Sequence, residues 1–217
     1  MTALMRRLMM MAAKEQGGGG LPDTFQQVEW IGTPSSGHKP YIDTGIVANA
    51  TVYRMAAKYI QTVSADYYGL GARLGDGSTN QLCFFGHYNN GSEWAWRGWF
   101  YGPRAMRNTI HEADATFRNG RQEIVFDGTT NTYNKTDDFK GTLNFYVFCR
   151  NNDGSAYSGY AYGMRYYYLK MWLDDVLVRD YIPCYRKSDG EIGLYDLVSN
   201  GFFTNAGPGT FGKGNDV

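Results

Sequence analysis

The chain has 217 residues, and its 21 lysines and arginines balance 21 aspartates and glutamates, so the formal net charge is zero. Proteins that bind nucleic acid carry a basic excess that neutralises phosphates, and we therefore expect no nucleic-acid partner. An aromatic content of 16% argues against a disordered chain, and 28 glycines argue against a helical one. No apolar run approaches the ~18 residues of a membrane-spanning helix.

The first sixteen residues differ from the rest of the chain and predict an amphipathic helix. Five apolar residues recur at three- and four-residue spacing on one face: Leu4, Met5, Leu8, Met9 and Ala12. A secretory signal peptide is the alternative, although the apolar run LMMMAA is shorter than the roughly 7 to 15 residues usual for that segment. Because an isolated short helix is marginally stable, we expect residues 1–16 to associate with another subunit.

Four consecutive glycines at 17–20 predict a flexible linker after this helix, with an expression scar as the alternative. From Leu21 onward the chain consists of short β-type runs separated by turn residues, without helical periodicity between them. This pattern predicts an all-β antiparallel sandwich over residues 21–217.

The predicted strands follow in chain order. They cover residues 25–31, 41–45, 52–61, 67–74, 81–88, 94–101, 109–118, 121–128, 142–150, and the long runs 161–175 and 176–186. Asn119 and Gly120 lie between two of these runs and predict a hairpin. Between residues 52 and 61, alternation predicts that Tyr53, Met55, Ala57 and Tyr59 share one face.

Three cysteines, Cys83, Cys149 and Cys184, each lie inside an apolar run. An odd number of thiols, none of them near a histidine at metal-ligand spacing, favours buried free cysteines over a disulfide framework or a zinc site. Free thiols fit assembly in a reducing cytoplasm.

Both ends of the sandwich carry recognisable motifs. The opening stretch VEWIGTPSSGHKPYIDTGI (28–46) and the closing stretch from Leu169 to Gly214, with VRDYIPC, GEIGLYD and FFTNAGPGTFGKG, resemble a concanavalin A/laminin G-like jelly-roll family. That family is common among phage and prophage tail or virion proteins of gut bacteria. These motifs indicate the fold but do not identify a ligand. The HKP segment at 38–40 departs from the family pattern.

The resemblance implies a jelly-roll β-sandwich of the concanavalin A-like type. Its apolar spacing predicts that Phe202 or Phe203, with Phe211, packs beside Val28 and Trp30, which brings both ends of the sandwich into one sheet. In GEIGLYD we expect Asp196 to accept backbone hydrogen bonds in a turn rather than to bind metal.

Catalysis has little support in the sequence. A glycoside hydrolase on this fold needs two carboxylates across a groove, and Glu112 with Asp114 is the pair with same-face spacing. The pair lacks a third carboxylate, and we expect a solvated strand face. No nucleophile elbow accompanies the three histidines, and neither a P-loop nor a dinucleotide fingerprint is present.

Aromatic and polar residues in the middle of the chain are the best candidates for ligand binding. In EWAWRGWFYGPR we expect Trp94 and Trp96 to enter the core, with Arg97, Trp99, Tyr101 and Arg104 exposed. The loop NNDGSAYSGYAYG supplies a second surface. Its candidates are Asn152, Asp153, Tyr157 and Tyr160. Asp153 is also compatible with a calcium site, although a simple Asp-Gly turn explains it as well.

These observations predict a non-enzymatic tail- or fibre-associated module of a phage virion. The particle would be assembled in the cytoplasm of the host bacterium. Residues 1–16 would contact other virion subunits and would mediate homo-oligomerisation. The sandwich would bind host-surface glycans without a cofactor. The alternatives are a bacterial glycan-binding adhesin or lectin, and a glycoside hydrolase on the same fold.

Overall fold

The computed structural model describes residues 20–37, 40–63, 67–73, 81–88, 91–96, 99–103, 106–136, 139–157 and 162–217. Within strands, the side chains of residues 67–68, 81, 83, 85–88, 91–96 and 99–101 lie outside the description. The predicted helix over 1–16 and most of the 17–20 linker also lie outside the described residues. The part of the chain that the structure describes holds no helix capable of crossing a membrane.

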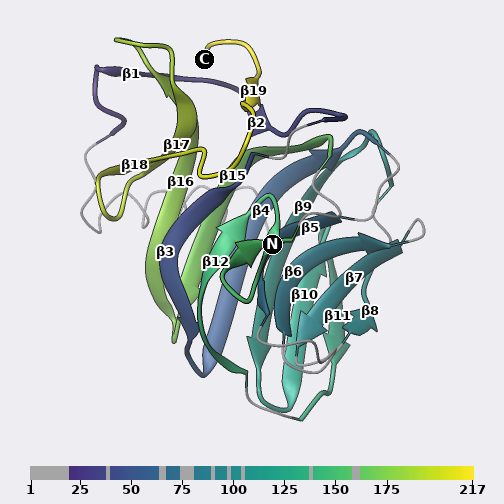
Figure 1. Ribbon diagram of the computed structural model, residues 1–217. Helices are drawn as coiled ribbons and strands as arrows, with labels where there is room; N and C mark the ends of the chain where they lie inside the picture. The colour runs from purple at the N-terminus through teal and green to yellow at the C-terminus, as the bar shows by residue number, and fades with distance from the viewer. Residues whose placement is uncertain are drawn as a thin grey trace, which may run out of the picture.

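The described residues form two sheets that face each other (Figure 1). In these residues, the large sheet has eleven strands and the small sheet has eight. The main order of the large sheet is β11 (Thr129–Tyr133), β10 (Arg121–Phe126), β9 (Ile110–Arg118), β4 (Val52–Gln61), β15 (Met164–Leu173), β16 (Val176–Arg186), β17 (Ile192–Asp196) and β18 (Gly201–Thr204). It is completed by β1 (Phe25–Gln27), β2 (Ile31–Gly32) and β19 (Gly212–Lys213).

The small sheet covers the inner face of the large one. Its main order is β14 (Ser155–Ala156), β13 (Arg150–Asn152), β5 (Tyr67–Arg73), β6 (Gln81–Tyr88), β7 (Gly91–Trp96) and β8 (Trp99–Tyr101), with β12 (Lys140–Val147) paired to β5 and to β3 (Ile42–Asn49). Apart from the parallel pair β5 and β13, the neighbours in both sheets are antiparallel. An all-β sandwich is confirmed.

Alternation in β4 and β9 creates the core between the sheets. Tyr53, Met55, Ala57 and Tyr59 are buried, as predicted, while their neighbours are only partly covered. Aromatic rings from the two sheets meet there: Phe117 stacks on Phe84 with ring centroids 4.7 Å apart. The hydroxyl of Tyr53 donates to the carbonyl of Phe139 at 2.8 Å, so this buried polar group is satisfied.

Turn chemistry fixes the long hairpins. Residues Arg118 and Arg121 pair directly around Asn119 and Gly120, which confirms the predicted hairpin between β9 and β10. The β15–β16 turn uses Asp174 and Asp175 with φ values of 48° and 64°, a left-handed backbone that aspartate tolerates better than most residues.

The two ends of the sandwich share the large sheet, as predicted. Gly212 and Lys213 of β19 pair with β2, and Val28 forms a bridge with Asp216. The ring of Phe202 lies 4.8 Å from that of Phe25. The opening run over 25–31, however, is divided into β1 and β2 rather than forming one strand.

The run over 94–101 is also not one strand. β7 ends at Trp96, and β8 starts at Trp99 and returns antiparallel to it, so that Ala95 pairs with Trp99. The prediction of a single alternating strand there was wrong, because β7 and β8 are two strands that pair antiparallel to each other. Cys149 and Cys184 are buried cysteines outside any disulfide, as expected, and the side chain of Cys83 lies outside the description.

Candidate functional site

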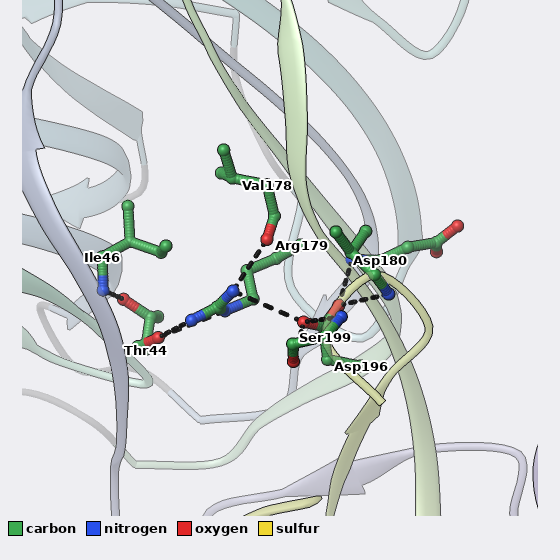
Figure 2. A network of polar contacts seen from close by, with 8 residues as sticks. Thr44, Ile46, Val178, Arg179, Asp180, Asp196 and Ser199 are labelled. Atoms are coloured by element: carbon green, nitrogen blue, oxygen red, sulfur yellow. Dashed lines mark hydrogen bonds and ion pairs between the residues drawn. The ribbon is translucent and has the colours of Figure 1, made fainter. Parts of the chain in front are cut away.

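The motif residues at the two ends of the chain meet in one polar network (Figure 2). Arg179 of β16 reaches from the large sheet to β3 of the small sheet, where its Nε and Nη2 donate to the carbonyl of Thr44 at 3.2 and 2.7 Å. The Thr44 hydroxyl donates in turn to the carbonyl of Phe145 at 2.8 Å. Arg179 therefore ties the two sheets together at this edge.

Asp196 completes this network from β17. Its Oδ1 accepts from the amides of Asp180 at 2.8 Å and Val198 at 3.2 Å, and its Oδ2 accepts from the amide and hydroxyl of Ser199 at 3.1 and 2.6 Å. Arg179 Nη1 lies 3.4 Å from Oδ2. Every carboxylate oxygen of this fully buried side chain is occupied by the scaffold, which confirms that Asp196 has a turn-building role.

A fourth motif joins the same edge through Asn205. Its Oδ1 accepts from the amide of Tyr41 at 3.1 Å, and the amide of Ala206 donates to the Tyr41 carbonyl at 2.8 Å. Residues from YIDTG, VRDYIPC, GLYD and TNAG thus hold one another in place. Their common task is structural, and a ligand site must be sought elsewhere.

The predicted loop over 151–163 is partly a hairpin. Asn152 belongs to β13, and Asp153 and Gly154 form the turn to β14 with φ values of 52° and 85°. The amide of Gly154 donates to Asn151 Oδ1 at 2.9 Å. An Asp-Gly turn accounts for Asp153, and calcium at this position stays an untested prediction.

Tyr157 follows this hairpin and lies against the small sheet. The Arg150 guanidinium lies 4.4 Å from the centre of its ring. Ala156, beside it, packs on a pair of stacked tyrosines, Tyr41 and Tyr146, whose ring centroids are 4.7 Å apart. The structure therefore brings Asn152, Asp153 and Tyr157 near further aromatic side chains, although Tyr146 is buried and presents little surface.

The other candidates are not placed by the structure. Arg97, Arg104 and Tyr160 lie outside the described residues, as do the side chains of Trp99 and Tyr101. The backbone of β8 puts Trp99 and Tyr101 on the strand next to β7 in the small sheet. Their proposed contacts with a glycan stay predictions.

The outer face of the large sheet carries a set of aromatic and charged side chains that the sequence analysis did not single out. Three cations lie over aromatic rings there: Arg54 over Trp172 at 4.4 Å, Arg165 over Trp30 at 4.0 Å, and Lys58 near Tyr167 at 5.9 Å. These residues come mainly from β4 and β15, which are neighbours in the sheet.

Carboxylates on the adjoining strands contact two of these cations, Arg54 and Lys58, and also Lys170. Arg54 donates from Nε and Nη2 to the two oxygens of Asp114 at 2.9 and 2.6 Å, and these bonds raise the pKa of Arg54. Lys58 lies 3.7 Å from Glu112, and Lys170 lies 2.8 Å from Asp180. The side chains on this face are thereby held in defined positions before any ligand arrives.

Tyr168 of β15 lies among these charged side chains. Burial, followed by the negative charges of Glu112 and Asp114, raises the pKa of its phenol to about 12. The phenol therefore keeps its proton at neutral pH and remains a hydrogen-bond donor.

A cleft of about 340 Å³ opens at the β9 side of this face. It is lined by Lys58, Ile110, Glu112, Asp127 and Gly128. Its carboxylates accept hydrogen bonds and its ammonium donates them, so it suits a hydroxylated ligand.

The two carboxylates considered for hydrolysis lie on this outer face, as the spacing predicted. Asp114 is held by both nitrogens of an arginine fork, so its oxygens are engaged before any substrate is bound. Among the described residues, no group of three or more histidine, cysteine, aspartate or glutamate side chains is arranged to hold a metal ion.

A bulge interrupts the alternation of β15, so the sequence pattern does not reveal this face. The register shifts between Tyr166 and Tyr168, so Tyr166 is buried while Tyr167 and Tyr168 are both only partly buried. The signal was the run YYYLKMW, whose four aromatic residues exceed what one core face of a strand accommodates.

Comparison with solved structures supplies a neighbour for this architecture. The mouse laminin alpha1 chain, domains LG4-5, superposes with a TM-score of 0.53 and 12% sequence identity, over 86% of this chain and 46% of that one. The chain has the fold of a laminin G-like sandwich. It spans just under half of the laminin structure, and at such low identity the likeness concerns the fold alone. No family model matches the chain, and no curated protein matches its sequence.

The laminin G-like, jelly-roll character agrees with the fold that the end motifs imply. In this architecture the Arg179 network closes one edge of the sandwich, while Arg54, Lys58, Glu112 and Asp114 on the outer face of the large sheet are partly exposed.

Proposed function

We propose that this chain is a non-enzymatic, tail- or fibre-associated module of a phage particle that binds host-surface glycans through the outer face of its large sheet. Residues 1–16 attach the sandwich to other virion subunits, and the glycine linker leaves the sandwich free to face outward. The particle assembles in the bacterial cytoplasm.

The observation that carries glycan binding is the set of paired side chains on β4, β9 and β15. Aromatic rings supply the apolar surface on which sugar rings pack, and charged groups supply donors and acceptors for hydroxyls. Because the salt bridges already fix Arg54 and Lys58, binding a glycan costs less side-chain entropy there than at a surface of free side chains.

The phage assignment rests on the motifs that resemble virion proteins. Those motif residues form the Arg179 and Asp196 network, which supports their role as a shared scaffold but is neutral about where the protein is displayed. A bacterial adhesin with the same sandwich is the competing assignment. A glycosidase is less well supported, because Asp114 is engaged by Arg54 through two bonds.

The test of binding uses the full-length chain on an array of bacterial surface glycans, compared with Tyr167→Ala. Removing the ring beside Lys58 should abolish most of the signal. Tyr185→Ala is the matched control, because Tyr185 is also a partly buried tyrosine of the large sheet but lies beside Lys213, away from β4 and β9. Equal signals from the two variants would contradict binding at this face.

The test of display is particle incorporation. Deleting residues 1–20 should leave a cooperative melt intact while the protein disappears from purified particles, measured by mass spectrometry of the particle fraction. Loss of the melt would contradict the two-part organisation. Secretion of the intact protein from the bacterium, without particles, would favour the adhesin.

A further inference from the structure

The cleft beside β9 has a charge pattern that selects among glycans. Glu112 and Asp127 line it with side chains 56% and 45% exposed, and Lys58 is the cation among its described lining residues. A ligand carboxylate or sulfate entering between two carboxylates would be repelled, whereas hydroxyl groups would donate to them. Ile110 adds an exposed apolar wall.

The volume of about 340 Å³ is small for a ligand site. Sites for small molecules run from roughly 300 to 1,000 Å³, so this cleft suits one sugar residue of a longer chain rather than an extended segment. The neighbouring Tyr167, near Lys58, lies where the next residue of the glycan would pack.

A buried histidine lies behind the acidic wall. His111 Nδ1 is 2.7 Å from Asp127 Oδ2, and Nε2 is 2.9 Å from the carbonyl oxygen of Met106. Both partners are acceptors, and together they hold the imidazole ring from two sides.

This histidine controls where Asp127 points. Asp127 has a left-handed backbone with φ of 47°, its amide donates to the Glu112 carbonyl at 2.9 Å, and its Oδ1 accepts from the Glu112 amide at 2.9 Å. The His111 contact fixes the remaining oxygen, Oδ2. Asp127 is therefore fixed against the backbone of Glu112, while the Glu112 carboxylate lies 3.7 Å from Lys58 Nζ.

The surroundings of His111 come from three elements. Tyr59 of β4 and Phe126 of β10 place their rings 5.9 and 4.9 Å from the imidazole, and the β10–β11 turn supplies Asp127. Glu112 follows His111 on β9 and faces the opposite side of the strand. Among the described groups, Asp127 is thus the charged partner of the ring, and Tyr59 is the other titratable group facing it.

We propose that the cleft lined by Lys58, Glu112 and Asp127 binds one neutral sugar residue, and that the imidazole ring of His111 positions its acidic wall. This inference rests on the glycan-binding function proposed above and narrows it to uncharged glycans. His111 is a positioning residue, because it acts on the ligand through Asp127.

The ligand class is tested with the full-length protein on printed neutral oligosaccharides (gluco-, manno- and galacto-oligosaccharides) and acidic ones (oligogalacturonates and hyaluronan fragments). Neutral glycans should bind, and Glu112→Gln and Asp127→Asn should each weaken that binding about tenfold, the loss expected for one hydrogen bond to a charged group. Glu123→Gln, a matched change on β10 outside the cleft, should leave it unaltered.

Binding of acidic glycans alone, or equal affinities for the Glu112, Asp127 and Glu123 variants, would overturn the assignment of this cleft while leaving glycan binding itself intact. A blank array with a folded protein would instead contradict the glycan-binding function on which it rests.

The positioning role of His111 is tested with two variants on the same neutral oligosaccharides. His111→Ala removes the contact to Asp127 Oδ2 and should weaken binding, whereas His111→Asn, whose side-chain amide can donate to the same oxygen, should retain it. Equal losses in the two folded variants would overturn the positioning role of His111.

Discussion

Two arginine–aspartate pairs of the large sheet invite comparison. Arg54 and Asp114 approach to 2.6 Å on the outer face with side chains 41% and 35% exposed, whereas Arg179 and Asp196 are 3.4 Å apart with side chains 13% and 0% exposed. The shorter pair faces water, which screens it, and the longer pair is buried among backbone groups. Burial and hydrogen bonding, rather than the N–O distance, determine which pair stabilises the fold.

The largest expected effect is at Asp196. Asp196→Ala leaves Arg179 without its carboxylate and three amides without an acceptor, so the free energy of unfolding should fall by about 3 to 5 kcal/mol. Denaturant titration of the full chain measures it. A loss below about 1 kcal/mol, typical of an exposed pair, would remove the distinction between the two regions.

The second prediction asks which surface binds the glycan. If the small sheet takes part, Trp99→Ala or Tyr101→Ala should weaken glycan affinity by about 1 to 3 kcal/mol, the range of aromatic stacking on a ring. Titration calorimetry with a glycan identified on the array gives the number. Full affinity in both variants, beside a loss in Tyr167→Ala, would confine binding to the large sheet.

A smaller effect is expected at the exposed pair. Asp114→Ala should change the free energy of unfolding by no more than about 1 kcal/mol, because solvent screens the charges. The same denaturant titration as for Asp196 checks it. A loss as large as that of Asp196→Ala would show that the outer face also carries the fold.

The smallest expected effect is on the stability of the fold at low pH, through Asp174. The Thr51 hydroxyl, then the amides of Val52 and Thr51, lower the pKa of Asp174 below 3.8. A carboxyl with a lowered pKa in the folded state contributes stability that is present above its unfolded value and lost as the pH falls through the folded one. Asp174→Asn, which tolerates the left-handed turn, should therefore lose less stability than the parent between about pH 6 and about pH 3. Identical acid curves would contradict this.

Sequence patterning predicted the strands well wherever alternation was regular. The run over 52–61 matches β4 and that over 176–186 matches the whole of β16. The hairpin at Asn119 and Gly120 followed from turn chemistry, and the approach of the two chain ends followed from the motifs. Local pattern decides such features, because each depends on neighbours along the chain.

The candidate site was less accessible to prediction. Arg54 and Asp114 are 60 residues apart, and Arg179 and Thr44 are 135 apart, so their pairing exists only after the sheets form. The bulge that leaves Tyr168 only partly buried shows in the sequence only as the aromatic run YYYLKMW, and His111 looked like one of three uninformative histidines. Residues that share no local pattern are brought together by strand order, which sequence periodicity does not encode.

The position of β1 has a mechanical consequence. β1 pairs with β16, and the strands from there to the cleft are β15, β4 and β9, all joined side by side. If the chain is held before Phe25 and a glycan is held at the cleft, tension crosses the ladders at right angles to the strands. Such a load peels hydrogen bonds in sequence, starting at the three-residue β1, rather than shearing a long ladder at once. Under force, the sandwich would yield first where it is tethered and last where it binds.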